Sequence, residues 1–269
     1  MNDHLYNKEE YARRISHGEI DTGAYYASPS KVEVEKAHSI VRNLFSSESE
    51  KVLDLGCSLG FYSFRFVSEN KFIVAVDYEL QSLLVANKHK EALPKKLQLN
   101  LTFLQADALH LPFQEEAFDK ISNVDFIEHI IPRHQATVVQ EICRVLKPDG
   151  RVYMYTPNYT RLRLEYYINK IKYAFHGRRF GWQEDRPYED KPDLPNHQDT
   201  LLHVGLLSFQ EVKQLFVQNG FSVDTVLYTE YSIPFLTSLS QKIIKKFNIR
   251  KPLFYSLFCS NSRDRKSVV

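Results

Sequence analysis

The segment from residue 52 to residue 63, VLDLGCSLGFYS, constrains the fold of this 269-residue chain more than any other. Its apolar run, residues 52–55, has the length of a central parallel strand and is short for a helix. Gly56 and Gly60 follow, and glycine lets a backbone turn sharply and approach a ligand closely. A helix that begins after Gly60 would point its free N–H groups at that ligand. We therefore expect a strand, a glycine turn and a helix around a binding site.

A second strand, residues 73–77, ends in an acid, Asp77. It begins about 20 residues after the first, where nucleotide-type folds hold ribose hydroxyls with a carboxylate. The two strands together predict a ligand that carries a ribose.

Two common classes of nucleotide site do not fit the glycine turn. Residues 56–60 do not supply the G-x-G-x-x-G of dinucleotide folds, and Phe61 stands where a phosphate-binding loop needs lysine. Asp54, just before the turn, would repel a pyrophosphate. Its charge suits a ligand with an ammonium and a sulfonium group.

These motifs resemble those of class I S-adenosylmethionine (SAM)-dependent methyltransferases, whose first motif commonly has the form V-L-D-L-G-C-G-x-G. Ser58 replaces one glycine of that motif, which we expect to be tolerated if its φ is negative. Residues 111–119 match an "LPF…FD" pattern, and residues 141–158 match E-x-x-R-V-L-K-P-x-G followed by T-P-N. These patterns are similar to the ubiquinone-type, methyltransferase-11-like family, strongly over residues 50–160 and more loosely over 200–230.

The resemblance implies an α/β, Rossmann-like fold. Its seven-stranded, mostly parallel sheet would have one antiparallel edge strand, helices on both faces and an inserted lid. Residues 148–150, Pro-Asp-Gly, are expected to stop a helix. Ser208 should cap a helix over residues 209–219, closed by Gly220. Further strands are expected at residues 100–105, 120–124, 151–156, 221–229 and, reversed, 253–258.

Four regions follow from this organisation. Residues 1–48 form an N-terminal arm over the cofactor site, with a helix at residues 31–45 that Ser30 caps. Residues 49–158 form the SAM-binding core. Residues 159–200 are an inserted acceptor lid, and residues 201–269 return to the core.

SAM is the cofactor that the resemblance implies. Asp54 and residues 56–60 would hold its methionine end, Asp77 its ribose and Asp107 its adenine. Tyr25 either contacts the cofactor or packs on the sheet. The other cofactor-binding positions assigned by resemblance are Gly56, Cys57, Ser58, Gly60, Tyr78, Ala108 and Asn123.

Asp125, Glu128 and His129 follow the expected strand at residues 120–124, at the sheet edge where ligands bind. In a helix, Asp125 would share a face with Glu128 and lie near His129. His129 can act as general base on an acceptor hydroxyl. The three residues also resemble the E-x-x-E-H metal motif of some O-methyltransferases, although Asp125 replaces the first glutamate. A purely structural role is the third alternative, and we assign no metal.

His203 and Tyr159 are candidates for the acceptor pocket, with a structural role as the alternative for His203. His110 is expected to be a loop residue. The aromatic residues of the lid make an apolar pocket credible, but they can equally belong to the core.

Composition bears on which partners and which cell compartment we expect. The formal net charge is +2, so nucleic acid is not expected as a partner. The three cysteines are unpatterned and indicate a reduced, cytoplasmic protein. We find no signal peptide and no apolar run long enough for a membrane helix. Two basic amphipathic stretches, in the lid and at residues 242–251, suggest peripheral membrane contact or simply a solvated helix face.

The sequence therefore predicts a SAM-dependent methyltransferase that acts on a small-molecule or lipid-like acceptor, at oxygen by analogy. An RNA methyltransferase and a non-catalytic SAM-binding partner protein are the alternatives. The acceptor and the oligomeric state are left open.

Overall fold

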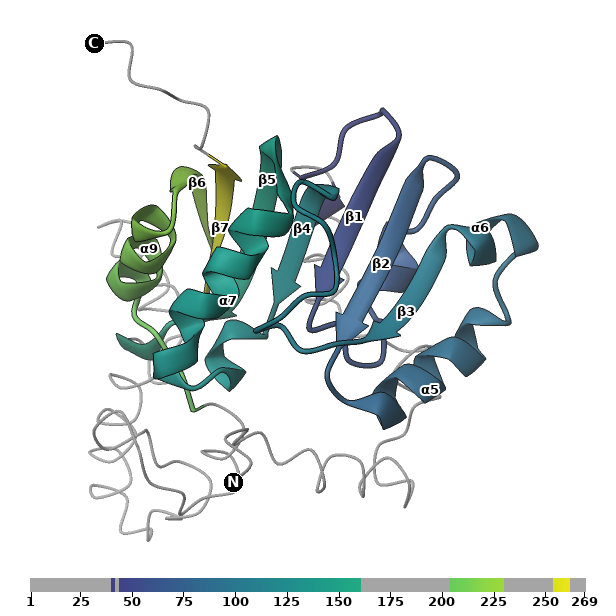
Figure 1. The fold of residues 1–269 in the computed structure, drawn as a ribbon, viewed down its shortest axis with the longest axis horizontal. Helices are drawn as coiled ribbons and strands as arrows, with labels where there is room; N and C mark the ends of the chain where they lie inside the picture. Colours follow the sequence, from purple (N-terminus) through teal and green to yellow (C-terminus); the bar gives the residue numbers. More distant parts are fainter. Residues whose placement is uncertain (1–39, 42–43, 161–203, 230–253, 262–269) are drawn as a thin grey trace, which may run out of the picture.

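The structure is a computed structural model of the chain, and it describes residues 40–41, 44–160, 204–229 and 254–261. Within these residues one sheet has the strand order β3-β2-β1-β4-β5-β7-β6 (Figure 1). The first five strands pair in parallel. This mostly parallel, Rossmann-like sheet confirms the predicted fold class. The strands are β1 (Glu50–Leu55), β2 (Lys71–Asp77), β3 (Leu101–Gln105), β4 (Phe118–Val124), β5 (Leu146–Pro157), β6 (Phe221–Thr229) and β7 (Phe254–Asn261).

The prediction of an antiparallel edge strand is wrong in one respect. Strand β7 is antiparallel to both of its neighbours, β5 and β6, and therefore lies inside the sheet. The outer strand is β6, which runs in the same direction as the parallel core. Hydrophobic periodicity shows where strands occur but not which strands pair, so this order could not be read from the sequence.

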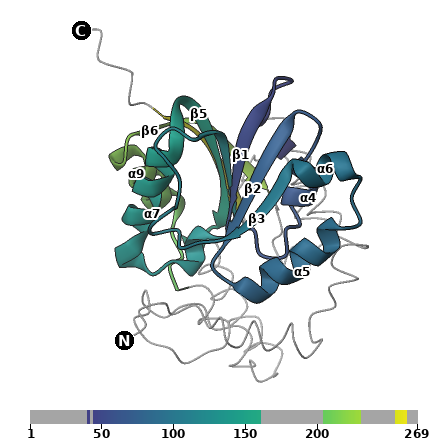
Figure 2. The same cartoon turned by 45° about the vertical axis from the view of Figure 1, so that its right-hand side comes forward.

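Helices cover both faces of the sheet (Figures 1 and 2). On one face α7 and α9 pack over the inward residues of β1, β4 and β5. On the other face α4, α5 and the helical residues Ile40 and Leu44 pack over the alternate residues of the same strands. The helices are α4 (Ser63–Phe66), α5 (Leu80–Lys90), α6 (Lys95–Leu99), η1, a 3-10 turn (Ile127–His129), α7 (Pro132–Val145) and α9 (Phe209–Gln218).

Burial on both faces explains why Val52, Leu53 and Leu55 of β1 are all apolar although neighbouring residues of a strand point to opposite faces. Val52 belongs to the core under α4 and α5, whereas Leu53 and Leu55 belong to the core under α7 and α9. All three side chains are at most 1% exposed. A central parallel strand buried on both sides is expected to lack polar alternation.

The end of α7 differs from the prediction. The helix ends at Val145, and Pro148 to Gly150 already belong to β5. Phe118 of β4 pairs with Leu146, but Lys120 pairs with Arg151, so β5 carries extra residues in a bulge. The Pro-Asp-Gly segment forms this bulge instead of stopping the helix, because Leu146 has already left the helical conformation.

The prediction for α9 is confirmed. Ser208 and Glu211 form a capping box, and Gly220 follows the helix with a φ of +91°. Of the helix predicted at residues 31–45, only Ile40, Val41, Leu44 and Phe45 are described. The residues expected to form the lid lie outside the described residues beyond Thr160, as do the basic residues 242–251. No described helix is long and apolar enough to cross a membrane.

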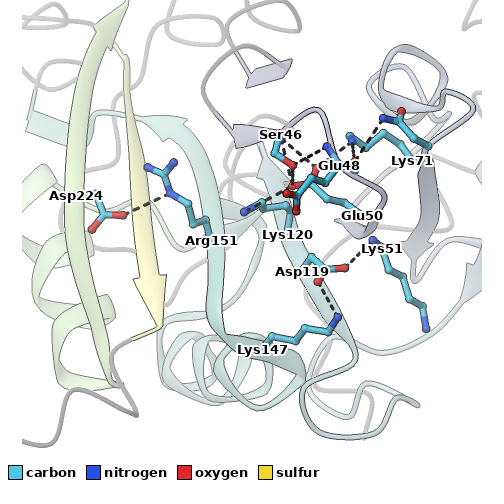
Figure 3. Close-up of polar contacts among 11 residues, drawn as sticks. Ser46, Glu48, Glu50, Lys51, Lys71, Asp119, Lys120, Lys147, Arg151 and Asp224 are labelled. Carbon is cyan, nitrogen blue, oxygen red and sulfur yellow. Dashed lines mark hydrogen bonds and ion pairs between the residues drawn. The ribbon is translucent and has the colours of Figure 1, made fainter.

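Charged residues gather at the amino ends of the parallel strands (Figure 3). Glu50, at the start of β1, is 6% exposed and pairs with Lys71 at 3.3 Å and Lys120 at 3.8 Å. Asp119 accepts hydrogen bonds from the Lys51 N–H and from Lys147. These contacts lie at the edge of the sheet opposite the carboxyl ends of the strands.

Candidate active site

The strand order reverses between β1 and β4, and in open α/β sheets ligands bind at the carboxyl edge of such a point. Asn123 joins the two strands there, because its Nδ2 donates to the Leu55 carbonyl at 3.3 Å. The Asn123 side chain is fully buried, and its Oδ1 has no hydrogen-bond partner among the described residues. A buried acceptor without a donor is unfavourable, so this oxygen is suited to a donor on a ligand.

Three residues of the loop after β1 have a left-handed backbone. The φ angles are +79° at Gly56, +48° at Ser58 and +81° at Gly60. The condition under which we expect Ser58 to be tolerated, a negative φ, is therefore not met. The loop has a left-handed conformation at this position, where the motif that the sequence resembles has glycine, and Ser58 adopts it at a steric cost.

The two glycines are required for packing as well as for turning. A Cβ at Gly56 would overlap the ring of Phe126, and a Cβ at Gly60 would lie 2.7 Å from the ring of Phe103. Aromatic rings therefore occupy the space that the missing side chains leave. The close approach of a ligand to this backbone stays a prediction.

Asp54 is an acid held in the core. Its side chain is 3% exposed and its Oδ2 accepts a 2.5 Å hydrogen bond from the hydroxyl of Ser63, at the start of α4. Burial raises the pKa of Asp54 to about 7, and the nearby charge of Asp77 adds to the increase. A cation bound here would remove this penalty, because it favours the ionised carboxylate.

Asp77 fastens the glycine loop to the end of β2. Its Oδ2 accepts the N–H of Ser58 at 2.7 Å, and its Oδ1 accepts the N–H of Glu79 at 2.9 Å. Burial raises the pKa of Asp77 above its ordinary value, although these two hydrogen bonds oppose the increase. Tyr78, which follows, is partly buried.

Cys57 is a buried part of the same loop. Its N–H donates to the Val76 carbonyl at 3.0 Å, so the loop is hydrogen-bonded to β2 by backbone as well. Burial and the charges of Asp77 and Asp54 raise the pKa of the Cys57 thiol, so it stays protonated.

Asp107 lies in the loop after β3, next to Asp77. The Ala106 N–H donates to the Asp77 carbonyl at 3.1 Å, and Asp107 Oδ1 accepts the Leu109 N–H at 2.9 Å. Asp107 is partly exposed and Ala108 is buried. The structure therefore brings the ends of β1, β2 and β3 together as the sequence predicted.

Helix α7 holds this loop through Glu141 and Arg144, the two charged residues of the E-x-x-R motif. Arg144 forms two 2.7 Å hydrogen bonds to Glu141 and also donates to the carbonyls of Phe113, at 2.7 Å, and Leu111, at 2.9 Å. Glu141 in turn accepts the Leu111 N–H at 2.8 Å. The pairing with Arg144 lowers the pKa of Glu141.

The three candidate catalytic residues do not share a helical face. Asp125 is exposed with a φ of +49°, before the short η1 turn begins. Glu128 is fully buried and accepts a 2.9 Å hydrogen bond from Thr156 Oγ1, whereas His129 is partly exposed. The expected i to i+4 arrangement is wrong because one 3-10 turn replaces the helix. No group of three His, Cys, Asp or Glu side chains in the described part of the chain is arranged to hold a metal.

The candidate acceptor side is described only in part. Tyr159 is partly buried and donates its N–H to the Leu207 carbonyl at 3.2 Å. The chain that ends at Thr160 and the chain that resumes at residue 204 therefore meet near the η1 turn. Tyr25 and His203 lie outside the described residues.

The residues present fit SAM. The two acids with raised pKa values, Asp54 and Asp77, suit the positive charges of its methionine end and the hydroxyls of its ribose. The buried Oδ1 of Asn123 offers an acceptor beside them.

Comparison with known proteins agrees with this geometry. A family model described as a methyltransferase domain matches residues 46–192, more than half of the chain. The chain is 26% identical over 176 residues to a demethylmenaquinone methyltransferase of Lactococcus lactis, covering 60% of this chain and 68% of that protein. It is 26% identical over 168 residues to a ubiquinone biosynthesis O-methyltransferase of Cronobacter sakazakii, covering 56% and 67%.

Among solved structures, a SAM-dependent methyltransferase of Methanosarcina mazei superposes with a TM-score of 0.58 at 17% identity, covering 82% of this chain and 96% of that one. This likeness shows the fold alone. The chain spans about half the length of several curated relatives that it matches. From the family match and the site geometry together, the chain belongs to the methyltransferase-domain family, within the class I SAM-dependent group that includes quinone-pathway methyltransferases.

Proposed function

We propose that the protein transfers the methyl group of SAM to a hydroxyl of a small-molecule or lipid-like acceptor. The observation that carries this proposal is the pair of acids, Asp54 and Asp77, beside one glycine loop at the switch point of the sheet. Two such acids favour a ligand that brings positive charge and hydroxyl donors. SAM supplies both, together with an electrophilic methyl group.

Each part of the loop has a role in this proposal. Asp54 faces the ammonium of the methionine end, Asp77 accepts from the ribose and Asp107 accepts from the adenine amino group. Asp77 keeps capacity for this, since its two carboxylate oxygens offer about four lone-pair sites and the backbone N–H groups of Ser58, Glu79 and Tyr78 take three.

SAM supplies an activated methyl group whose departure leaves a neutral thioether. His129 accepts the acceptor's hydroxyl proton as the new oxygen–carbon bond forms and the carbon–sulfur bond breaks. Its place on the η1 turn, beyond the carboxyl end of β4, supports this role. Glu128 is buried against Thr156 and supports the turn, and the exposed Asp125 precedes it.

Replacing His129 tests the catalytic part of the proposal. His129→Ala should bind SAM with unchanged affinity and transfer methyl groups about 100-fold more slowly or worse, which is the usual contribution of a general base. His134→Ala, on α7, is the matched control and should keep full activity. Unchanged turnover in His129→Ala would remove His129 from the mechanism.

Transfer to carbon is the second candidate, because one relative, of Agrobacterium fabrum, is named a ubiquinone/menaquinone biosynthesis C-methyltransferase. The two outcomes can be separated with ¹³C-methyl SAM and two acceptors, a catechol and a reduced naphthoquinone. The chemical shift of the labelled methyl group distinguishes a methyl ether from a ring methyl group. Labelled product from neither acceptor, with SAM bound, would favour a different acceptor class or a non-catalytic SAM-binding protein.

A further inference from the structure

Gln135, near the start of α7, makes an unusual set of contacts. Its side chain is 3% exposed, and its Nε2 donates to the carbonyls of Ile127 and Ile130, both at 3.2 Å, and of Gly205 at 2.6 Å. A side-chain amide has two N–H groups, so three carbonyls share two donors. Because all three partners are acceptors, only the nitrogen of the amide can occupy this position.

Gly205 completes the contact from the other side. Its N–H donates to the Glu128 carbonyl at 2.8 Å. A Cβ at this position would overlap the Ile130 carbonyl oxygen and Gln135 Nε2. The backbone of Gly205 therefore lies directly against the η1 turn, and any side chain would push the two apart.

The same region is tied to the end of β5. The Leu207 carbonyl accepts the Tyr159 N–H at 3.2 Å, and Glu128 accepts from the Thr156 hydroxyl at 2.9 Å. Three segments that are far apart in the sequence thus meet around the turn that carries His129.

The η1 turn has little stability of its own. It is one 3-10 turn of three residues, Ile127–His129, without a side-chain cap. Such a turn lacks the cooperative hydrogen bonding of a longer helix. Its conformation therefore depends on tertiary contacts, among them those that Gln135 and Gly205 make with the carbonyl groups of Ile127 and Glu128.

We propose that Gln135 is a positioning residue that fixes the η1 turn against Gly205 and thereby sets the orientation of His129. The link to catalysis rests on the proposed function. The contact of Gln135 and Gly205 with the turn is independent of the proposed function.

The test uses the full chain and needs no acceptor. Gln135→Met keeps the length of the side chain but removes the donors, and Gln140→Met, an exposed position on the same helix, is the matched control. Hydrogen exchange measured by mass spectrometry should be about tenfold faster or more in peptides covering residues 126–131 and 204–208 of Gln135→Met. The pH titration of the His129 ring signal, followed by NMR, should move in that variant alone. Exchange over residues 50–60 and SAM affinity by calorimetry should stay at wild-type values.

Gly205→Ala provides a second route to the same contact. It should speed exchange in the same two peptides, and its effect should not add to that of Gln135→Met, since both break one contact. If Gln135→Met does not fold, Gln135→Asn, which keeps the amide but shortens its reach, takes its place with the same expected result.

Wild-type exchange in both peptides and an unmoved His129 titration in folded Gln135→Met would overturn the inference. Failure of the wild-type protein to bind SAM would instead overturn the proposed function. That failure would leave the exchange result decisive for Gln135.

Discussion

The backbone N–H of Ser58 lies 2.7 Å from Oδ2 of Asp77, and this hydrogen bond joins the glycine loop to the second strand. Ser58 makes it from a left-handed conformation, with a φ of +48°. The acid assigned to the ribose is thus also the residue that holds the loop for the methionine end. This contact therefore links the shape of the cofactor site to its charge.

Substitutions at Ser58 should follow backbone preference. Ser58→Gly should change the free energy of unfolding by less than about 1 kcal/mol, because relief of the strain offsets the added chain entropy. Ser58→Val should cost about 1–2 kcal/mol more, because a β-branched residue is strongly disfavoured at positive φ. Urea unfolding of the two variants checks the order. Equal stability of both would show that the loop is not left-handed at this position.

SAM affinity should depend on pH through Asp54. Because its pKa is raised to about 7, the free protein holds a proton on Asp54 below that pH. The ammonium of SAM favours the ionised form, so affinity should fall as the pH decreases from 7 to 5, by at most about tenfold per unit. Calorimetry over this range, where an α-ammonium remains charged, measures the slope.

The raised pKa of Asp54 affects the stability of the unliganded protein in the opposite direction: stability should fall as the pH rises. An acid with a raised folded pKa contributes stability below its unfolded pKa of about 4, and that contribution is lost as the pH rises through about 7. Asp54→Asn removes the titrating group. It should therefore lower the affinity for SAM and make that affinity less dependent on pH. Asp119→Asn, at the opposite edge of the sheet, should leave the slope unchanged. A pH-independent wild-type affinity would contradict the role of Asp54.

Arg144 should matter for the loop that carries Asp107. Arg144→Met removes the donors to the Leu111 and Phe113 carbonyls and leaves Glu141 without its cation, at a cost of about 1–3 kcal/mol in stability. SAM affinity should also decrease, because the loop after β3 loses its anchor. Lys147→Met breaks the more exposed pair with Asp119 and should cost less than about 1 kcal/mol. Thermal unfolding and SAM titration of both variants give the comparison, and equal effects would argue against the anchor.

A substitution at Lys71 should lower the free energy of unfolding without changing the affinity for SAM. This residue is 5% exposed and pairs with Glu50 at the amino edge of the sheet (Figure 3). Lys71→Met leaves a buried carboxylate with less compensation and should cost about 3 kcal/mol. SAM affinity at a temperature where the variant is folded should stay unchanged, because the cofactor site lies at the other edge. A parallel loss of affinity would mean that the two edges are coupled.

Most strands could be predicted from the sequence because burial on both faces leaves short segments rich in apolar residues, such as Val52, Leu53 and Leu55 of β1. The glycine turn, Asp77 at the end of β2 and Asp107 after β3 could be placed because each follows an apolar segment along the chain. Three features could not. The φ of Ser58 depends on the loop as a whole, and the position of β7 depends on strand pairing. The contact between Gln135 and Gly205 joins residues 70 positions apart. Residue patterns report local periodicity, not distant partners.

The most direct measurement is a calorimetric titration of the purified protein with SAM and with its demethylated product, beside Asp77→Ala and the distant control Asp119→Asn. The account predicts binding of both ligands to the wild-type protein and to Asp119→Asn. In Asp77→Ala, which loses the ribose contact and the tie to Ser58, it predicts loss of binding. Absence of binding to the folded wild-type protein, or equal affinity in Asp77→Ala, would contradict the account.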